Sequence, residues 1–196
     1  MNPPNNALRH VIAALVTNEP GVLAQVAGMF AARGFNIDSL VVGRTENPEL
    51  SRMTIVVSGS DAVLEQVCKQ LQKLVPVVKV VAYRDAAFVE RDLILVQVLT
   101  QSDNANANSD KRDEIITLAN LFRAKVVDVA PQQLMIELSG TEDKIEAFIQ
   151  LIKPYGIIEL ARTGVIAMPR GNTSGRAHRT ESATGPQIDE GDLPPG

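Results

Sequence analysis

The sequence predicts an α+β fold of two ferredoxin-like βαββαβ domains, each an antiparallel sheet with two helices on one face. Two observations support this prediction. The chain contains two copies of one pattern: Met53–Gly59 in the first half aligns with Leu134–Gly140 in the second, and both stretches alternate, reach Ser-Gly and open an amphipathic helix. Apolar residues make up 45% of the chain and charged residues 21%, which is typical of globular proteins and sufficient for a buried core.

The first half begins at an apolar stretch and ends near Arg84. From Val22, apolar residues recur at i, i+4, i+7 and i+8, which indicates one buried helix face. Gly34 is typical of the position after a helix, and Pro76 stops the second helix. The expected elements are strand His10–Thr17, turn 18–21, helix Val22–Arg33, strands Asn36–Arg44 and Arg52–Ser58, helix Asp61–Leu74 and strand Val77–Tyr83.

The second half repeats this order. A polar stretch, Ser102–Ser109, is expected to be a loop where the first half has a tight Pro-Gly turn. Pro154 and Gly156 separate the last helix from the last strand. The expected elements are strand Asp92–Thr100, helix Lys111–Phe122, strands Lys125–Val129 and Gln133–Ser139, helix Glu142–Ile152 and strand Ile157–Val165.

The composition changes at both ends of the chain. From Arg170 onward Gly, Pro, Ser and Thr dominate, and such a segment buries too little apolar surface to offset its ordering entropy. We therefore expect a flexible N-terminus at 1–8, domains at 9–85 and 86–168, and a disordered tail at 169–196. Each domain, at roughly 80 residues, is marginal alone. The sheet face away from the helices needs a cover or a partner.

Charge and composition exclude several classes of protein. The net charge is −4 and there is no Trp, which argues against a nucleic-acid-binding protein. A single cysteine, Cys68, permits no internal disulfide and indicates a reducing compartment. The start of the sequence lacks the pattern of a signal peptide, and no apolar run approaches the roughly 20 residues that span a bilayer. The expected location is cytoplasmic, with no membrane partner.

Residues suited to catalysis or metal binding are sparse. The two histidines are His10, at a strand start, and His178, in the expected tail. Together with Cys68, which falls on an apolar helix face, they form neither a metal-ligand set nor a Cys-His nucleophile pair. No phosphate-binding glycine motif is present. We expect a chain with no catalytic residues, no metal site and no cofactor of its own.

The segment from Leu15 to Leu23 is the most informative one. A strand ends, the chain turns through Pro20 and Gly21, and a helix begins, so unpartnered N–H groups with partial positive charge face the turn. Such a helix start suits a carboxylate. Asn18 offers an amide nearby, and an apolar wall would come from Val22, Leu23 and Ile37. These features suit an aliphatic amino acid; an ordinary strand-to-helix turn is the alternative.

Several segments together resemble a known family. The first of them resembles the ACT domain, a βαββαβ amino-acid-sensing module, and the full set resembles the regulatory (small) subunits of acetohydroxyacid synthase, also called acetolactate synthase. The similarity extends over about Arg9–Gly171, which makes 9–85 the ACT domain. The segments are Thr17–Leu23, Arg33–Leu40, Leu50–Ile55, Val89–Arg91 and Ala161–Val165.

The resemblance implies a homodimer in which two ACT sheets lie side by side and bind valine, the feedback inhibitor, at their interface. Asn18 and the turn at Gly21 of one chain would hold its polar groups, while Asn36 and Ile37 approach from the other. Pro20 would stiffen the turn. Asn36 also has a simpler reading, as a residue that shapes the turn after Gly34.

The resemblance further implies a partner, the catalytic (large) subunit of acetolactate synthase, which carries thiamine diphosphate, magnesium and FAD. That subunit condenses pyruvate with pyruvate or 2-oxobutyrate on the way to valine, leucine and isoleucine. This chain would bind it, raise its activity and confer valine sensitivity. The alternative is an ACT-type dimerisation or amino-acid-binding module that regulates another enzyme. The sequence shows neither the helix-turn-helix and basic surface of a transcription factor nor the convergent titratable groups of a self-sufficient enzyme.

Overall fold

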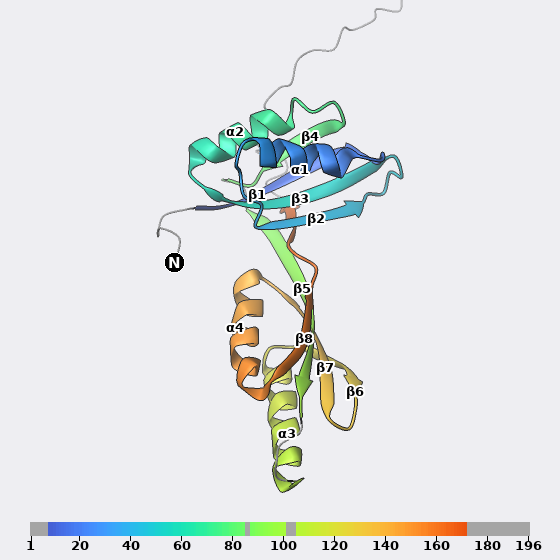
Figure 1. The fold of residues 1–196 in the computed structure, drawn as a ribbon, viewed down its shortest axis with the longest axis vertical. Helices are drawn as coiled ribbons and strands as arrows, with labels where there is room; N and C mark the ends of the chain where they lie inside the picture. Colours follow the sequence, from blue (N-terminus) through green and yellow to red (C-terminus); the bar gives the residue numbers. More distant parts are fainter. Residues whose placement is uncertain (1–7, 85–86, 101–104, 172–196) are drawn as a thin grey trace, which may run out of the picture.

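A computed structural model describes residues 8–84, 87–100 and 105–171. It confirms the predicted fold class: two βαββαβ domains follow one another, each an antiparallel sheet covered by helices on one face (Figure 1). Strand β5 runs out of the first domain into the second. Helices α1 and α2 lie on the face of the first sheet that points away from the second domain.

The N-terminal sheet has the strand order β2-β3-β1-β4. β1 pairs with β3 over its whole length, from Leu8 opposite Gly59 to Thr17 opposite Leu50. β2 pairs with β3 alone among the described strands and forms one sheet edge. The elements are β1 Leu8–Thr17, α1 Val22–Ala32, β2 Ser39–Arg44, β3 Leu50–Gly59, α2 Asp61–Leu71 and β4 Val77–Ala82.

The C-terminal sheet has the equivalent order, β6-β7-β5-β8, and β9 pairs with the first residues of β5. The resulting β5–β9 ribbon reaches the N-terminal sheet. The elements are β5 Phe88–Leu99, α3 Ala105–Leu121, β6 Lys125–Val129, β7 Gln133–Gly140, α4 Glu142–Ile152, a short 3₁₀ turn η1 Lys153–Tyr155, β8 Ile157–Arg162 and β9 Ile166–Pro169.

Each domain has its own apolar core, centred on Phe30 in the first and Phe148 in the second. A third cluster lies between the domains, on the helix-free face of the first sheet. It joins β1 and β3 side chains to those that follow β4 and β8: Val11, Ala13, Val56, Tyr83, Val165 and Ala167. The second domain therefore supplies part of the cover that the helix-free face of the first sheet needs.

Two predicted boundaries are wrong. The expected loop Ser102–Ser109 is helical from Ala105, where α3 begins. Alanine is the strongest helix former, and polar composition does not distinguish a solvated helical turn from a loop. The expected strand Ile157–Val165 is broken after Arg162, because Gly164 has a φ of +89° and turns the chain toward the first domain. Of the expected tail 169–196, Pro169 is the last residue of β9 and pairs with Phe88, and of the expected flexible N-terminus 1–8, Leu8 begins β1. Residues 1–7 and 172–196 lie outside the described residues.

Within the described ranges, each helix is too short or too polar to cross a bilayer.

Candidate functional site

The turn before α1 has the geometry of an open helix start. Gly21 is the residue before the first helical turn and has a φ of +86°, a conformation that disfavours side chains with a Cβ. A Cβ built at Gly21 would have no heavy atom within 4 Å, so the space beside it is open. Backbone bonds from Thr17 N–H to Pro76 O and from Asn18 N–H to Glu49 O, at 2.9 and 2.7 Å, hold the turn in place.

The N-terminus of α1 carries no counter-charge of its own. No side chain caps it, and its first turn contains no acidic residue. The free N–H groups at this end therefore keep their partial positive charge and face solvent at an exposed turn. An added carboxylate is the group that such an end binds best.

The amide of Asn18 is held in one orientation. Its Nδ2 donates to Pro48 O at 3.0 Å, and its Oδ1 accepts from the Ser51 hydroxyl at 3.1 Å. A carbonyl can only accept, so Pro48 fixes which end of the amide is nitrogen. One Nδ2 hydrogen and one Oδ1 lone pair stay free for a ligand.

The predicted apolar wall is only partly available. Leu23 is 47% exposed beside the turn, and Ile37 is half-buried against the first core. Val22 is only 4% exposed and belongs to that core, so its side chain does not line the surface. The first apolar position of an amphipathic helix faces the core, so the exposed part of the predicted wall within one chain comes from Leu23 and Ile37.

Asn36 lies in the segment between α1 and β2, with its side chain exposed. Its Nδ2 donates to Asp38 Oδ1 at 2.7 Å, and Asp38 Oδ2 accepts from the Ser58 hydroxyl at 2.7 Å. These bonds shape the turn, as its simpler reading expects. They leave the carbonyl oxygen of the Asn36 amide without a partner in the described part of the chain.

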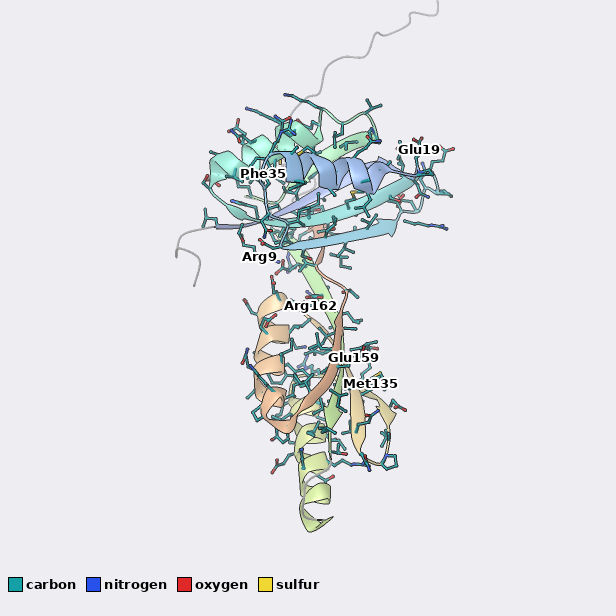
Figure 2. The ribbon with its side chains drawn as sticks, in the orientation of Figure 1. Arg9, Glu19, Phe35, Met135, Glu159 and Arg162 are labelled. Carbon is teal, nitrogen blue, oxygen red and sulfur yellow. The ribbon has the colours of Figure 1, made fainter. Side chains whose placement is uncertain are left out.

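The structure does not bring the two halves of the predicted site together within one chain. Asn18 and Gly21 precede α1, whereas Asn36 and Ile37 follow it. Eleven helical residues, at about 1.5 Å each, separate the two ends by roughly 16 Å. Glu19 and Phe35 mark these opposite ends of α1 in Figure 2. A ligand that contacts both halves needs a second chain.

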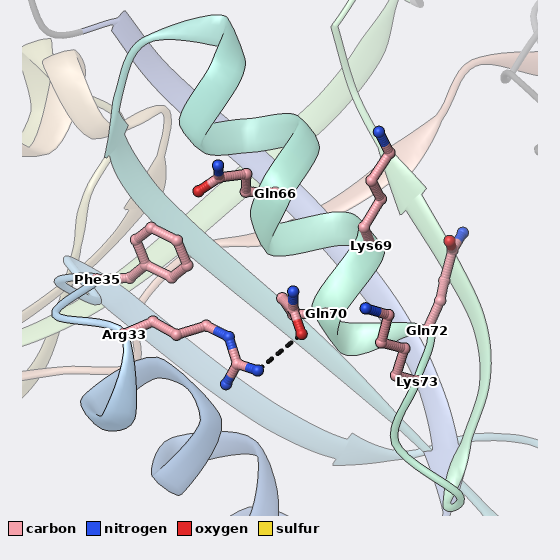
Figure 3. Close-up of a pocket in the computed structure, with 7 residues that line it drawn as sticks. All are labelled: Arg33, Phe35, Gln66, Lys69, Gln70, Gln72 and Lys73. Carbon is pink, nitrogen blue, oxygen red and sulfur yellow. Dashed lines mark hydrogen bonds between the residues drawn. The ribbon is translucent and has the colours of Figure 1, made fainter.

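A separate hollow of about 640 Å³ lies between the end of α1 and α2 (Figure 3). Arg33 crosses it and donates to Gln70 Oε1 at 2.8 Å, and Lys69 pairs with Glu65 at 2.5 Å. Most of its polar side chains are exposed. It does not include the turn at Gly21. Its lining residues are Arg33, Phe35, Gln66, Lys69, Gln70, Gln72 and Lys73.

The two side chains with reactive chemistry among the described residues, Cys68 and His10, are held by packing or by a hydrogen bond. Burial raises the pKa of the Cys68 thiol to about 11, so this side chain is a protonated packing residue at neutral pH. His10 is 7% exposed, and its Nε2 lies 3.0 Å from Gly59 O. The described residues contain no cluster of three or more His, Cys, Asp or Glu suited to a metal ion.

Sequence reasoning missed two residues of this region, Pro48 and Ser51. Ser51 enters through the register of β1 against β3, which places it opposite Val16 and beside Asn18, and Pro48 enters from the loop before β3. No spacing in the sequence points to these two residues, although Ser51 lies in Leu50–Ile55, one of the segments that resemble the small-subunit family.

Comparisons with known proteins agree with this arrangement. Residues 12–79 match a family model described as an AHAS small subunit-like ACT domain, and residues 91–171 match one described as the small subunit of acetolactate synthase. The chain is 54% identical to a probable acetolactate synthase small subunit of Archaeoglobus fulgidus, over 84% of this chain and 99% of that one. It is 47% identical to an acetolactate synthase small subunit of Mycolicibacterium smegmatis, over 85% and 94%.

A solved structure has a similar fold. The crystal structure of the acetolactate synthase small subunit from Thermotoga maritima superposes with a TM-score of 0.73, at 42% identity, over 83% of this chain and 98% of that chain.

Proposed function

Because this chain belongs to the family of acetolactate synthase small subunits, we propose that it binds and activates the catalytic subunit and makes it sensitive to valine. Small subunits of this family are regulatory. In this role the chain would take part in the feedback control of branched-chain amino acid biosynthesis. The catalytic subunit would supply thiamine diphosphate, magnesium and FAD. The observation that carries the proposal is the open, uncapped start of α1 at Gly21 beside the fixed amide of Asn18.

The chemistry of the turn suits the effector. Free N–H groups at the start of α1 would donate hydrogen bonds to the valine carboxylate, and Gly21 would let the carboxylate approach the backbone. The amide of Asn18 has a donor and an acceptor to spare for the carboxylate and ammonium groups. Leu23 offers an exposed aliphatic surface for the isopropyl group.

The second half of the site would come from a second copy of the chain, joined through β2. Among the described strands this sheet edge is free, and Val42 on it is 44% exposed. Helix α1 contains no charged residue, and most of its exposed residues, among them Ala24, Ala27 and Gly28, are small; Leu23 and Gln25 are the larger ones. Such a face packs closely against a second helix. Both features support a dimer of side-by-side ACT sheets.

The symmetry of that dimer would complete the site. If β2 pairs antiparallel with its copy about a twofold axis, each α1 runs antiparallel beside the other. The start of one α1 then lies near the end of the other, where Asn36 and Ile37 follow. Two equivalent sites result, and each takes its turn from one chain and its Asn36 loop from the other.

A second candidate function is an ACT-type module that regulates another enzyme. The same turn and the same sheet edge support it equally, and only the catalytic partner differs.

Reconstitution tests the proposal. The purified chain is mixed with the catalytic subunit of acetolactate synthase from the same organism, and product formation is measured with and without valine. We expect a rise in activity on mixing and a saturable loss with valine. No rise on mixing contradicts the proposed partner, and a rise without valine sensitivity contradicts the proposed effector.

A further inference from the structure

Three consecutive residues between β8 and β9 join the two domains, and each contacts a different element. Arg162 reaches α4, Thr163 is bonded to β5, and Gly164 lies against β2 of the first domain. These residues form the 162–164 turn. It connects β2, the edge strand of the first sheet among the described strands, to the helix layer of the second domain.

The contact with β2 is close. A Cβ built at Gly164 would lie 2.7 Å from Ser39 Oγ and 2.9 Å from Val41 Cγ2, so a larger residue there would force β2 side chains or the turn itself to shift. The next residue, Val165, donates its N–H to Ser39 Oγ at 3.2 Å. Because β2 and the turn are in direct contact here, a movement of β2 toward the turn would push Gly164.

The contact with the second domain is firm. The carboxylate of Asp92 on β5 has no exposed side-chain surface, and it pairs with the Arg162 guanidinium. Thr163 donates to Asp92 Oδ1 at 3.3 Å and accepts from Leu93 N–H at 3.2 Å. Breaking a buried, paired carboxylate is costly, so the turn and β5 move as one unit.

The same guanidinium reaches α4. Arg162 Nη1 lies 2.6 Å from Glu146, and its Nη2 lies 3.6 Å from Glu142. Arg9 at the start of β1 contacts the same Glu142 at 2.8 Å and lies 3.0 Å from Glu90 Oε2. Glu90 Oε2 is buried and accepts no well-aligned hydrogen bond, so that contact is a charge pair only. Figure 2 labels Arg9 on the first-domain side of the boundary and Arg162 on the second-domain side.

We propose that the 162–164 turn is the link that passes the effector state from the β2 edge to the second domain. This inference rests on the proposed function, in which valine acts where β2 meets its copy. A change in the pairing of β2 moves Ser39 and Val41, these side chains displace Gly164, and Arg162 carries the displacement to α4. A ligand shifts such an equilibrium only by its differential affinity for the two arrangements.

Thermodynamic reciprocity provides the test. If valine weakens the productive complex with the catalytic subunit by some factor, the catalytic subunit weakens valine binding by the same factor, typically ~5- to 150-fold. Valine affinity is therefore measured by calorimetry for the full chain alone and for its complex with the catalytic subunit. The ratio of the two dissociation constants is the coupling.

The variant is Gly164→Ala, and the matched control is Gly156→Ala. Both glycines have strongly positive φ values, +89° and +91°, so both substitutions carry similar backbone strain. The new Cβ would meet β2 only at position 164; at 156 it meets Leu99 of the second domain at 3.3 Å. We expect Gly164→Ala to bind valine alone within about threefold of the unaltered chain while the coupling ratio falls below about two. The control should keep the ratio of the unaltered chain.

A second variant covers the case in which Gly164→Ala does not fold. Glu142→Gln keeps its size but loses its charge toward Arg9 and Arg162. Glu65→Gln is the control, because the ion pair of Glu65 is with Lys69 on the same helix of the first domain. The coupling ratio should fall for the first and not for the second. An unchanged ratio in both Gly164→Ala and Glu142→Gln overturns the link but leaves valine binding intact. Absence of valine binding by the unaltered chain overturns the proposed function, and the link with it.

Discussion

The Ser51 hydroxyl donates a hydrogen bond to Asn18 Oδ1 across 3.1 Å, although 33 residues separate the two in the sequence. This bond and the one from Asn18 to Pro48 fix the amide before any ligand arrives. A donor that is already oriented loses little entropy on binding, so Asn18 has the geometry of a recognition residue.

Replacing Asn18 by alanine should weaken valine binding. The lost hydrogen bond to a charged group is worth about 1.5–3 kcal/mol, or roughly 10- to 150-fold in the dissociation constant. Calorimetry with the purified chain measures the change. Ser51→Ala is the control, because it removes a neighbour of the amide without removing the amide. Equal losses in the two variants would mean that Asn18 acts through folding.

Replacing Gly21 by aspartate should abolish valine sensitivity. The substitution strains a backbone at φ +86° and puts a negative charge beside the site of the carboxylate. Gly21→Asn separates these effects, because asparagine tolerates this conformation and carries no charge. Inhibition of the reconstituted enzyme should be lost in the first variant and largely kept in the second. Full inhibition of Gly21→Asp would place the effector elsewhere.

Cys68 should resist alkylation in the folded protein. Burial raises its pKa to about 11, which lowers the thiolate fraction at pH 8 more than 100-fold below that of a free thiol. The raised pKa also means that this thiol contributes stability below its unfolded pKa of about 8.5, and that this contribution is lost as the pH rises toward 11. Iodoacetamide labelling followed by mass spectrometry checks the first point. Rapid labelling at pH 8 without denaturant would contradict it, and labelling in guanidinium is the positive control.

Phe30 should dominate the stability of the first core. It is 1% exposed, and its ring meets that of Phe35 edge-on with centroids 6.4 Å apart. Truncation to alanine should lower the free energy of unfolding by about 3–5 kcal/mol. Leu121→Ala, at a side chain that is 73% exposed, should change it by less than about 0.5 kcal/mol. Guanidinium denaturation monitored by circular dichroism measures both. If Phe30→Ala and Leu121→Ala lowered the free energy of unfolding by similar amounts, Phe30 would not be a central residue of the first core.

Most of the fold could be predicted because its signals are local. The apolar spacing from Val22 placed α1, and the repeated Ser-Gly stretches placed β3 and β7 with their following helices. The missed element is β9, which is only four residues long and buries a single small side chain, Ala167, against the first domain, while Ile166 and Met168 are exposed. Its pairing with β5 depends on Gly164, whose positive φ the sequence does not reveal.

The candidate site was predictable only in part. Gly21 and Asn18 flank a helix start, so chain order alone placed them together. Pro48 and Ser51 join them through strand register, which no local pattern encodes. An apolar residue at a helix start can line a surface site or pack in the core, and the sequence does not distinguish the two; Val22 packs in the core.

The central claim is that each valine site is shared between two chains, and a mixing experiment tests it directly. In a Gly21→Asp homodimer both sites have a defective turn before α1, and in an Asn36→Ala homodimer both sites have a defective segment after α1. Neither homodimer therefore has an intact site. A heterodimer of the two variants has one site with both defects and one site with none. Refolding an equimolar mixture and titrating it with valine should restore binding at up to one site per heterodimer, with the affinity of the unaltered chain. If the mixture binds no more valine than the two variants do separately, the site is not shared and the account is wrong.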